Sequence, residues 1–244
     1  MAQTLFISDL HLSPERPEIV SLAAHFLRTR ASTSDALYIL GDLFEYWIGD
    51  DQPTQGLEPV LEAFEALKAA SLPMYFIAGN RDFLLGETFA ERHGLTLLPE
   101  TTVIDLYGTP TLLLHGDTLC TDDHRYQAMR QTLRNPDWQR EFLALPLPQR
   151  IQHAKALREQ SKAETSTKNE MIMDVNPQAV LNAMQAAGVK RMIHGHTHRP
   201  AIHELRINGQ SAQRIVLADW YQRGNALVCD EQGCRMEAVR PATR

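Results

Sequence analysis

Groups that bind metals occur directly after five short apolar runs of the sequence. In chain order they are D-x-H at Asp9 and His11, GD at Asp42, GNRD at Asn80, HGD at His115, and GHTH at His196 and His198. Carboxylate, imidazole and amide oxygen together suit divalent manganese, iron or zinc. One GD pair or one histidine usually marks a turn or a core residue. It would be a rare coincidence for five such motifs to follow apolar runs if each were only a turn. Together they predict a metal centre.

This set of ligands indicates a particular chemistry. Two cations held about 3.5 to 4 Å apart lower the pKa of a water between them and neutralise charge on a phosphoryl group. A hydroxide is then available near neutral pH, and no side chain has to attack. Asp82 and Asp117 each follow a ligand motif, and each could orient a ligand or cap the turn after a strand. The ligands therefore favour a hydrolase that cuts a phosphorus–oxygen bond.

The runs that precede these motifs are short and rich in branched and aromatic residues, which predicts buried strands. They are TLFISD, ALYILGD, MYFIAGN, TLLLHGD and RMIHGH. Amphipathic helices are predicted over roughly 17–30 and 57–70, so strands and helices alternate in a layered α/β fold. The polar strand ends should collect at one edge of a sheet. After His198, alternation in HELRI, QRIVLAD and NALVC predicts an antiparallel ending and a second sheet packed on the first.

The segment 121–175 interrupts this rhythm and is predicted to be a helical insertion within one domain that spans 1–244. Its part from Arg125 to Lys168 carries nine basic and four acidic residues, a local charge of +5 in a chain of net charge −6. Such a surface could attract a polyanionic substrate or be an ordinary solvated helix face. The apolar string FLALPLP inside it could line an acyl-chain groove, contact a membrane surface or pack between helices.

The composition of the chain is that of a soluble globular protein. Of its 244 residues, 43% are hydrophobic and 22% are charged, and the negative net charge argues against a general nucleic-acid binder. The sequence lacks a run of about 18 apolar residues and a recognisable signal peptide, which favours a cytosolic location. Cys120, Cys229 and Cys234 are odd in number and lack C-x-x-C spacing, so reduced, packing cysteines are predicted.

From Ser8 to His198 the motifs resemble those of the calcineurin-like metallophosphoesterases, and every ligand motif of that family is present. The resemblance implies two packed mixed β-sheets flanked by helices. The implied ligands are Asp9, His11 and His198 for the first metal, Asn80, His115 and His196 for the second, and Asp42 for both.

One position departs from the wider family. Many members have GNHD where this chain has GNRD, and their histidine is thought to protonate the leaving oxygen. Arg81 cannot act as an acid near neutral pH, but its planar fork of donors can stabilise negative charge. A phosphate that leaves from an anhydride has a pKa near ~6 and needs no proton, so Arg81 favours pyrophosphate cleavage. The alternative is that Arg81 only pairs with a neighbouring aspartate.

Longer strings resemble a narrower family, the bacterial UDP-2,3-diacylglucosamine pyrophosphatases of lipid A biosynthesis. The matching strings are FISDLHL, ALYILGDLFEYWIGDD, GNRDFLLG, TLLP, LHGDTLCTDD, IMDVN and IHGHTHRPA. The resemblance implies a helical lid at 121–175, two Mn²⁺ ions, and hydrolysis of UDP-2,3-diacylglucosamine to UMP and 2,3-diacylglucosamine 1-phosphate by attack of water on the uridylyl phosphorus. It also implies a lipid-linked nucleotide substrate and peripheral contact with the cytoplasmic face of the inner membrane, without an obligate protein partner or nucleic acid.

The same resemblance assigns site residues beyond the metal ligands. The implied catalytic residues are Asp42, Asn80, Arg81 and His196. The implied substrate contacts are Asn80, Arg81, Asp123, Ser161, Thr165, Lys168 and His196. Thr165 departs from the family pattern, because asparagine can occupy that position. Tyr46 and Trp47 are expected to form the wall of the site.

Two other functions compete with this hypothesis. A nucleotide or dinucleoside polyphosphate phosphatase could use the same metals and Arg81, but it would have no need of FLALPLP. A metal-binding scaffold without turnover is the second rival, but a degenerate module should have lost ligands, and all seven are present.

Overall fold

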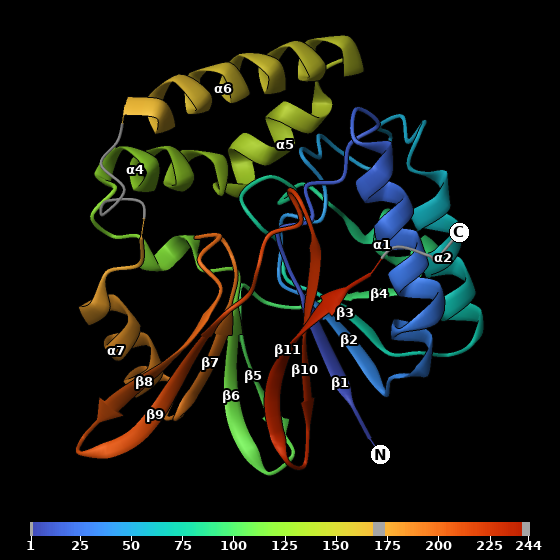
Figure 1. Ribbon diagram of the computed structural model, residues 1–244. Helices are drawn as coiled ribbons and strands as arrows, with labels where there is room; N and C mark the ends of the chain where they lie inside the picture. Colours follow the sequence, from blue (N-terminus) through green and yellow to red (C-terminus); the bar gives the residue numbers. More distant parts are fainter. Residues whose placement is uncertain (1, 168–173, 241–244) are drawn as a thin grey trace.

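A computed structural model describes the backbone of residues 2–167 and 174–240, and the side chains of 2–159 and 174–240. Two β-sheets pack face to face, with helices on their outer faces (Figure 1). This arrangement confirms the predicted fold class. All five predicted strands are present, and they are β1 (Thr4–Ile7), β2 (Ala36–Ile39), β3 (Met74–Phe76), β6 (Thr109–Leu114) and β7 (Arg191–His194).

The first sheet has six strands in the order β11-β10-β1-β2-β3-β4. Strands β1 to β4 run parallel, and β10 lies antiparallel to β1. The additional strands of this sheet are β4 (Leu95–Leu97), β10 (Gly224–Asp230) and β11 (Gly233–Val239). Its outer face is covered by α1 (Pro17–Thr29), α2 (Glu58–Ala69) and α3 (Glu87–His93). The two helices predicted from periodicity are α1 and α2, which bury Phe26 and Phe64.

The second sheet has five strands in the order β5-β6-β7-β9-β8. Strands β6, β7 and β9 are parallel to one another, while β5 and β8 pair antiparallel at the two edges. The additional strands are β5 (Thr101–Leu106), β8 (Ala201–Ile207) and β9 (Gln210–Val216). Helix α7 (Pro177–Ala186) covers its outer face through Val180 and Met184. Apolar side chains from both sheets, including Phe6, Leu113 and Ile193, form the core between them.

Three helices cross the C-terminal ends of the strands: α4 (His124–Leu133), α5 (Pro136–Ala144) and α6 (Leu147–Thr167) (Figure 1). FLALPLP joins α5 to α6, and Leu145 and Leu147 within it pack against the core of the first sheet. Arginines of these helices fix them to the body. Arg150, which is 3% exposed, donates to the carbonyl of Ile48 and pairs with Asp51. Within the described residues, every helix is too short or too polar to cross a membrane.

The prediction of reduced cysteines is wrong for one pair, because Cys229 and Cys234 form a disulfide. The β10–β11 hairpin places these two residues directly opposite each other, with their Cα atoms 4.1 Å apart. The pairing follows from hairpin register, which a search for C-x-x-C spacing does not detect. Cys120 is a buried thiol, as expected.

Candidate metal centre

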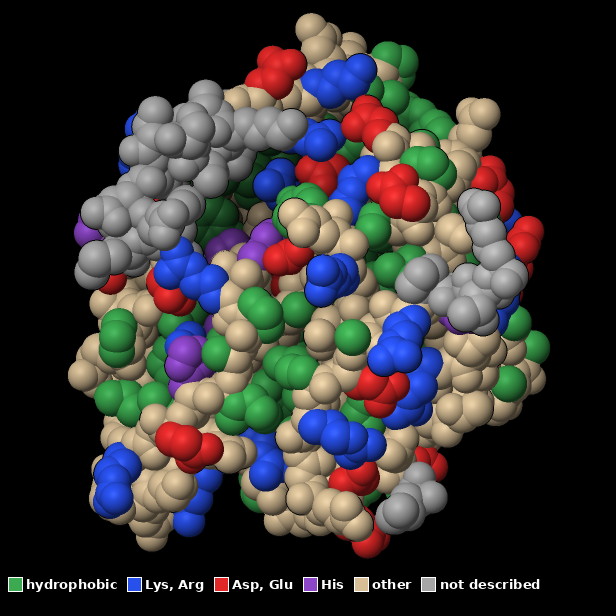
Figure 2. All heavy atoms as spheres, viewed as in Figure 1, with side chains coloured by type: hydrophobic (Ala, Val, Ile, Leu, Met, Phe, Trp, Pro, Cys, Tyr) green, Lys and Arg blue, Asp and Glu red, His purple; other side chains and the backbone are tan. Residues whose placement is uncertain are grey.

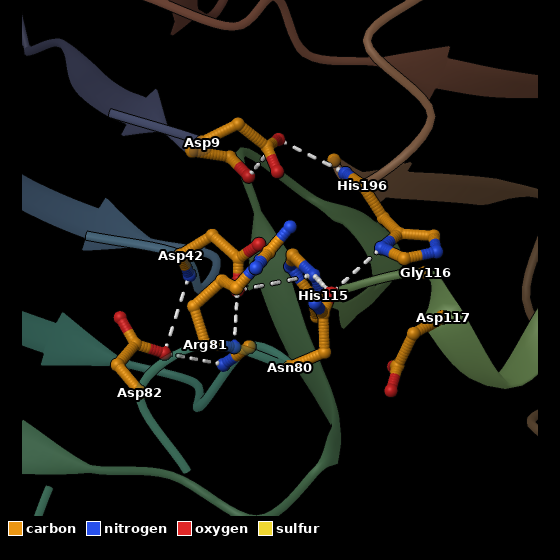
Figure 3. Close-up of polar contacts among 12 residues, drawn as sticks. Asp9, Asp42, Asn80, Arg81, Asp82, His115, Gly116, Asp117 and His196 are labelled. Carbon is orange, nitrogen blue, oxygen red and sulfur yellow. Dashed lines mark hydrogen bonds and ion pairs between the residues drawn. The ribbon is translucent and has the colours of Figure 1, made fainter. Parts of the chain in front are cut away.

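Strand direction brings the five polar motifs together. The C-terminal ends of β1, β2 and β3 lie at one edge of the first sheet, and those of β6 and β7 lie at the adjacent edge of the second (Figure 1). Asp9, Asp42, Asn80, His115 and His196 come from these ends and point toward one another (Figure 3). The site therefore lies between two sheets, whereas the sequence suggested the edge of a single sheet.

The first group of ligating atoms contains Asp9, His11 and His198. His11 Nε2 lies 3.3 Å from His198 Nε2, and His198 Nε2 lies 3.4 Å from Asp9 Oδ1. The other oxygen of Asp9 is held in place, because it accepts hydrogen bonds from the Ser8 hydroxyl at 2.5 Å and from the backbone N–H of His196 at 2.9 Å. One oxygen of Asp9 thus fixes the carboxylate while the other faces the histidines.

The second group contains Asn80, His115 and His196. Asn80 Oδ1 lies 2.9 Å from His115 Nε2 and 2.9 Å from His196 Nδ1. Nδ1–H of His115 donates to the carbonyl of Leu40 at 2.8 Å, so Nε2, which faces Asn80, is the ring nitrogen that can bind a cation once it is deprotonated.

Asp42 lies between the two groups. Its Oδ2 is 3.8 Å from His11 Nε2, and its Oδ1 is 3.6 Å from His115 Nε2. The side chain is only 3% exposed. Each oxygen of this carboxylate therefore faces a different group, so Asp42 is placed to be shared by two cations.

The backbone around these ligands adopts unusual conformations. Asp9, His11, Asp42, His196 and His198 all have φ between 48° and 70°, in the left-handed region that non-glycine residues seldom occupy. Such conformations persist only where the surroundings enforce them, and they concentrate at functional sites. Gly41 allows a close approach here, because a Cβ on it would lie 2.6 Å from both the backbone of Gly79 and His115 Nδ1.

Burial sets the protonation of the ligands in the metal-free protein. It lowers the pKa of His11 and of His196 to about 3, so both rings are neutral at neutral pH. Burial also raises the pKa of Asp42 to about 7, with further contributions from Asp82 and Asp9. It opposes the charged form of His115 as well, but the carboxylates of Asp42 and Asp9 outweigh this and raise its pKa to about 9.

These atoms fit a pair of divalent cations. Among the described residues, Asp9 Oδ1, which faces the first group, is buried without a hydrogen-bond partner. Ligands held about 2.1 Å from one cation are about 3 Å apart, close to the separations observed in both groups. Neutral imidazoles, carboxylates and an amide oxygen are suitable donors for a divalent transition metal. The residues present therefore could hold a cation in each group.

Asp82 supports this centre through the backbone. Its carboxylate is fully buried and accepts hydrogen bonds from the N–H groups of Leu43 at 2.7 Å and Gly79 at 2.9 Å, with longer ones from Asp42 and Phe44 (Figure 3). It therefore holds together the two loops that carry Asp42 and Asn80. The sequence suggested a contact with a ligand side chain or a cap, and the structure shows a carboxylate that joins two loops.

Asp82→Ala is expected to lower the free energy of unfolding by about 3 kcal/mol, because buried N–H groups would lose their acceptor. Thermal or urea unfolding of the metal-free protein measures this. Asp105→Ala is the matched control, since Asp105 also accepts a backbone hydrogen bond, from Gly108, but in an exposed turn. Equal losses from the two variants would contradict the role given to Asp82.

Asp117 connects the centre to α4. Its carboxylate is 1% exposed, and it accepts hydrogen bonds from the Tyr126 hydroxyl at 2.8 Å and from Arg130 Nε at 2.7 Å. Arg134 of the next helical turn donates to the carbonyl of Gly79 at 2.9 Å. These basic side chains dock the helix onto the body. Arg130 and Arg134 are therefore not simply part of a solvated face.

A pocket extends from the metal centre beneath α4, α5 and α6. Its empty volume is about 860 Å³, part of it open to solvent. Its polar lining residues include Glu45, Asn80, Arg81, Arg130, Arg134 and Arg158, and its apolar lining residues include Trp47, Phe83, Met129, Leu133, Trp138 and Phe142. Figure 2 shows histidine side chains at the base of a hollow on this face, with Lys and Arg side chains around it. The arrangement suits a ligand with a phosphate at one end and an apolar group at the other.

The structure brings some of the expected substrate contacts together. Asn80, Arg81 and His196 lie at the centre, and within the described residues the Arg81 guanidinium forms no ion pair and its Nε has no hydrogen-bond partner. Asp123 lies at the start of α4 and accepts the N–H of Tyr126. Ser161 and Thr165 lie on α6, but their side chains are outside the described part, and Lys168 lies outside the described residues altogether.

Sequence reasoning missed two residues beside the ligands. Tyr221 stacks on the His11 ring, with centroids 5.1 Å apart and planes at 12°, and the Arg16 guanidinium lies 4.9 Å from the centroid of the Tyr221 ring. Glu45 is 6% exposed and faces His11. A carboxylate in the apolar string LFEYWIG, three residues after Asp42, was a signal that could have identified Glu45. Tyr221 lies in a loop far along the chain and left no comparable signal.

Comparisons with known proteins agree with this geometry. The family model for calcineurin-like phosphoesterases matches residues 2–200. The chain is 51% identical to the UDP-2,3-diacylglucosamine hydrolase of Xanthomonas axonopodis pv. citri over 97% of its own length and 98% of that protein's length. It is 51% identical to the protein of that name from Stenotrophomonas maltophilia, over 97% of this chain and 98% of that protein. It is 50% identical to the one from Photobacterium profundum, over 96% of this chain and 96% of that protein.

Proposed function

The chain belongs to the calcineurin-like phosphoesterase family, and from this premise we propose that it hydrolyses the pyrophosphate bond of UDP-2,3-diacylglucosamine, giving UMP and 2,3-diacylglucosamine 1-phosphate. One observation carries the proposal: a pocket with a long apolar wall opens directly onto the candidate metal centre at Asn80 and Arg81. A nucleotide phosphatase would need the metals and the arginine but not the apolar wall. Relatives about half identical over almost their whole length bear the name of this hydrolase.

The metal centre is assigned in this proposal as follows. Asp9, His11 and His198 would hold the first cation, Asn80, His115 and His196 would hold the second, and Asp42 would be shared by both. Manganese suits this mixture of imidazole and oxygen donors, although the donors alone would also accept iron or zinc. Two bound cations would supply an activated water and neutralise charge on the reacting phosphate.

Side chains near the centre then orient the substrate. Arg81 lines the pocket with Nε unpaired, where its guanidinium stabilises the departing lipid phosphate as an anion. Asn80 and His196 contact the attacked phosphoryl group as well as a cation, while Asp123, Ser161, Thr165 and Lys168 bind the remainder of the head group. The acyl chains occupy the apolar wall, and segment 121–175 acts as a lid over them.

The proposed location is the cytoplasmic face of the inner membrane, with peripheral attachment and without an obligate protein partner. Support comes from two exposed apolar side chains: Tyr46, which lines the pocket, is 37% exposed, and Leu143, which follows the lining residue Phe142 in sequence, is 41% exposed. Apolar side chains at this position would meet the lipid surface that delivers a diacylated substrate.

Hydrolysis in heavy-oxygen water tests the function. With Mn²⁺ present, the label is expected in UMP, because water attacks the uridylyl phosphorus and the lipid phosphate leaves. Label in the lipid phosphate would reverse the orientation of substrate against Arg81. A UDP-sugar without acyl groups is the matched control, and equal turnover of it would favour the nucleotide phosphatase. Absence of Mn²⁺-dependent cleavage of either compound would support a scaffold without turnover.

The affinity for Mn²⁺ is expected to rise between pH ~6 and pH ~9, because ligation requires deprotonated ligands. In the metal-free protein burial raises the pKa of Asp42 to about 7, and the nearby carboxylates raise that of His115 to about 9, so this pair retains protons at the lower end of this range. Binding must then release these protons, and the apparent affinity falls as pH falls through the two pKa values. Calorimetric titration in buffers of different ionisation enthalpy counts the protons. An affinity that stays constant across this range would contradict the assignment.

A further inference from the structure

Glu45 is a buried carboxylate next to a proposed metal ligand. Its side chain is 8% exposed, and Oε2 lies 3.5 Å from His11 Nδ1. This nitrogen has no hydrogen bond within the described residues, and the opposite ring nitrogen, Nε2, faces His198 and Asp42. A carboxylate on the far side of a ligating imidazole fixes the tautomer and the ring orientation. Glu45 is therefore in the place from which it can direct Nε2 of His11 toward the first cation.

The backbone keeps Glu45 at this place. The chain after β1 and the chain after β2 continue side by side, since Leu12 N–H donates to Leu43 O at 2.9 Å and Glu45 N–H donates to Leu12 O at 3.0 Å. Glu45 is thus fixed relative to the residue that follows His11. A small rotation of the carboxylate is enough to turn the 3.5 Å contact into a hydrogen bond.

The second oxygen of Glu45 is occupied by α6. Arg158 NH2 lies 3.0 Å from Glu45 Oε1, with the arginine side chain 28% exposed. An ion pair this well covered is weakly screened, and loss of one partner leaves a buried charge. The contacts form a chain from α6 to the first group of ligands: Arg158, Glu45, His11.

We propose that Glu45 is a positioning residue for His11 and that Arg158 couples the docking of α6 to the affinity of the first metal site. The proposal rests on the metal centre proposed above. Coupling is reciprocal, so a cation at the first site also favours the docked position of the helix. A substrate that occupies the pocket beneath α6, where Arg158 is a wall residue, meets the same arginine and therefore acts on the same contacts.

Titration of the purified metal-free protein with Mn²⁺, followed by electron paramagnetic resonance, tests this without relying on turnover. Glu45→Gln is expected to weaken the first site about 10- to 100-fold and to leave the second site unchanged. Arg158→Met should weaken the first site by a smaller factor, about 3- to 10-fold, and Arg158→Lys should restore part of the loss. In the double variant Glu45→Gln/Arg158→Met, affinity should be no lower than in Glu45→Gln alone, because both changes break one chain of contacts.

Arg150→Met is the matched control, since Arg150 docks the same helix through Asp51 and faces no ligand. It should lower thermal stability and leave both Mn²⁺ affinities unchanged. If Arg158→Met changed only KM for substrate, or if Arg150→Met weakened the first site equally, the coupling would be wrong. If wild-type protein bound two Mn²⁺ ions without hydrolysing the substrate, only the proposed function would be contradicted. If Glu45→Gln left the Mn²⁺ affinity unchanged, only this inference would be contradicted.

Discussion

Asp42→Ala is expected to lower the rate of hydrolysis at least ~10³-fold while leaving the fold intact. The reason is geometric: its two oxygens lie 3.8 Å from His11 Nε2 and 3.6 Å from His115 Nε2, so one substitution would remove a ligand from both proposed cations. Asp9 also lies near both His198 and His115, but one of its oxygens is held by Ser8 and by the backbone N–H of His196. Rates on the diacylated substrate, together with metal content of the purified variant, measure the effect.

Asp137→Ala controls for removal of a negative charge, because Asp137 is exposed and pairs only with Arg140 of its own helix. Circular dichroism should show both variants folded. Asp42→Ala should retain less than the two metal ions of the parent protein. Near-normal turnover by Asp42→Ala would mean that the two groups of ligands do not act as one centre.

Arg81→Ala is expected to slow hydrolysis about 10²- to 10³-fold with both cations retained. Its side chain is not used to hold the fold, since within the described residues the guanidinium has no ion-pair partner. The loss should appear in kcat, because charge on the leaving phosphate grows in the transition state. Arg81→Lys should recover only part of it, as an ammonium lacks the planar fork.

Arg140→Ala is the matched control for loss of a basic side chain near the pocket, because Arg140 is 73% exposed on α5 and forms its ion pair within that helix. A substrate with a better leaving group than the lipid phosphate should suffer less from Arg81→Ala. If Arg81→Ala hydrolysed all substrates normally, the leaving-group argument would fail. If it lost metal, the arginine would be a structural support of the centre instead.

The strands that carry the ligands could be predicted because each is a short apolar run that ends at a polar residue or a glycine. TLFISD and RMIHGH lie almost two hundred residues apart, yet the same local pattern identifies both as strands β1 and β7. Strands β4, β5 and β11 were missed, because three residues of mixed polarity in β4 and the partly exposed, polar sequences of β5 and β11 give weak signals. The distribution of the ligands over two sheets could not be predicted either, because local sequence patterns do not show which strands pair.

Supporting residues were harder to predict than ligands. Glu45, Asp82 and Asp117 act through the partners that the fold gives them, namely His11, backbone N–H groups and Arg130. A carboxylate in the sequence carries no mark of which partner it will meet. The basic segment from Arg125 to Lys168 is an example. Several of its arginines dock the helices onto the body, and only the three-dimensional structure distinguishes these arginines from solvent-exposed ones.

Because the ligands come from the ends of strands in both sheets, bound cations would act as a cross-link between two halves of the molecule. Neither sheet could come apart from the other without losing ligands, so stability should depend on the free metal concentration. At a hundredfold excess over the dissociation constant, a ligand specific for the native state adds about 2.7 kcal/mol per site. Chelation would then loosen the whole molecule, and the supply of metal would influence how long the protein persists as well as how fast it works.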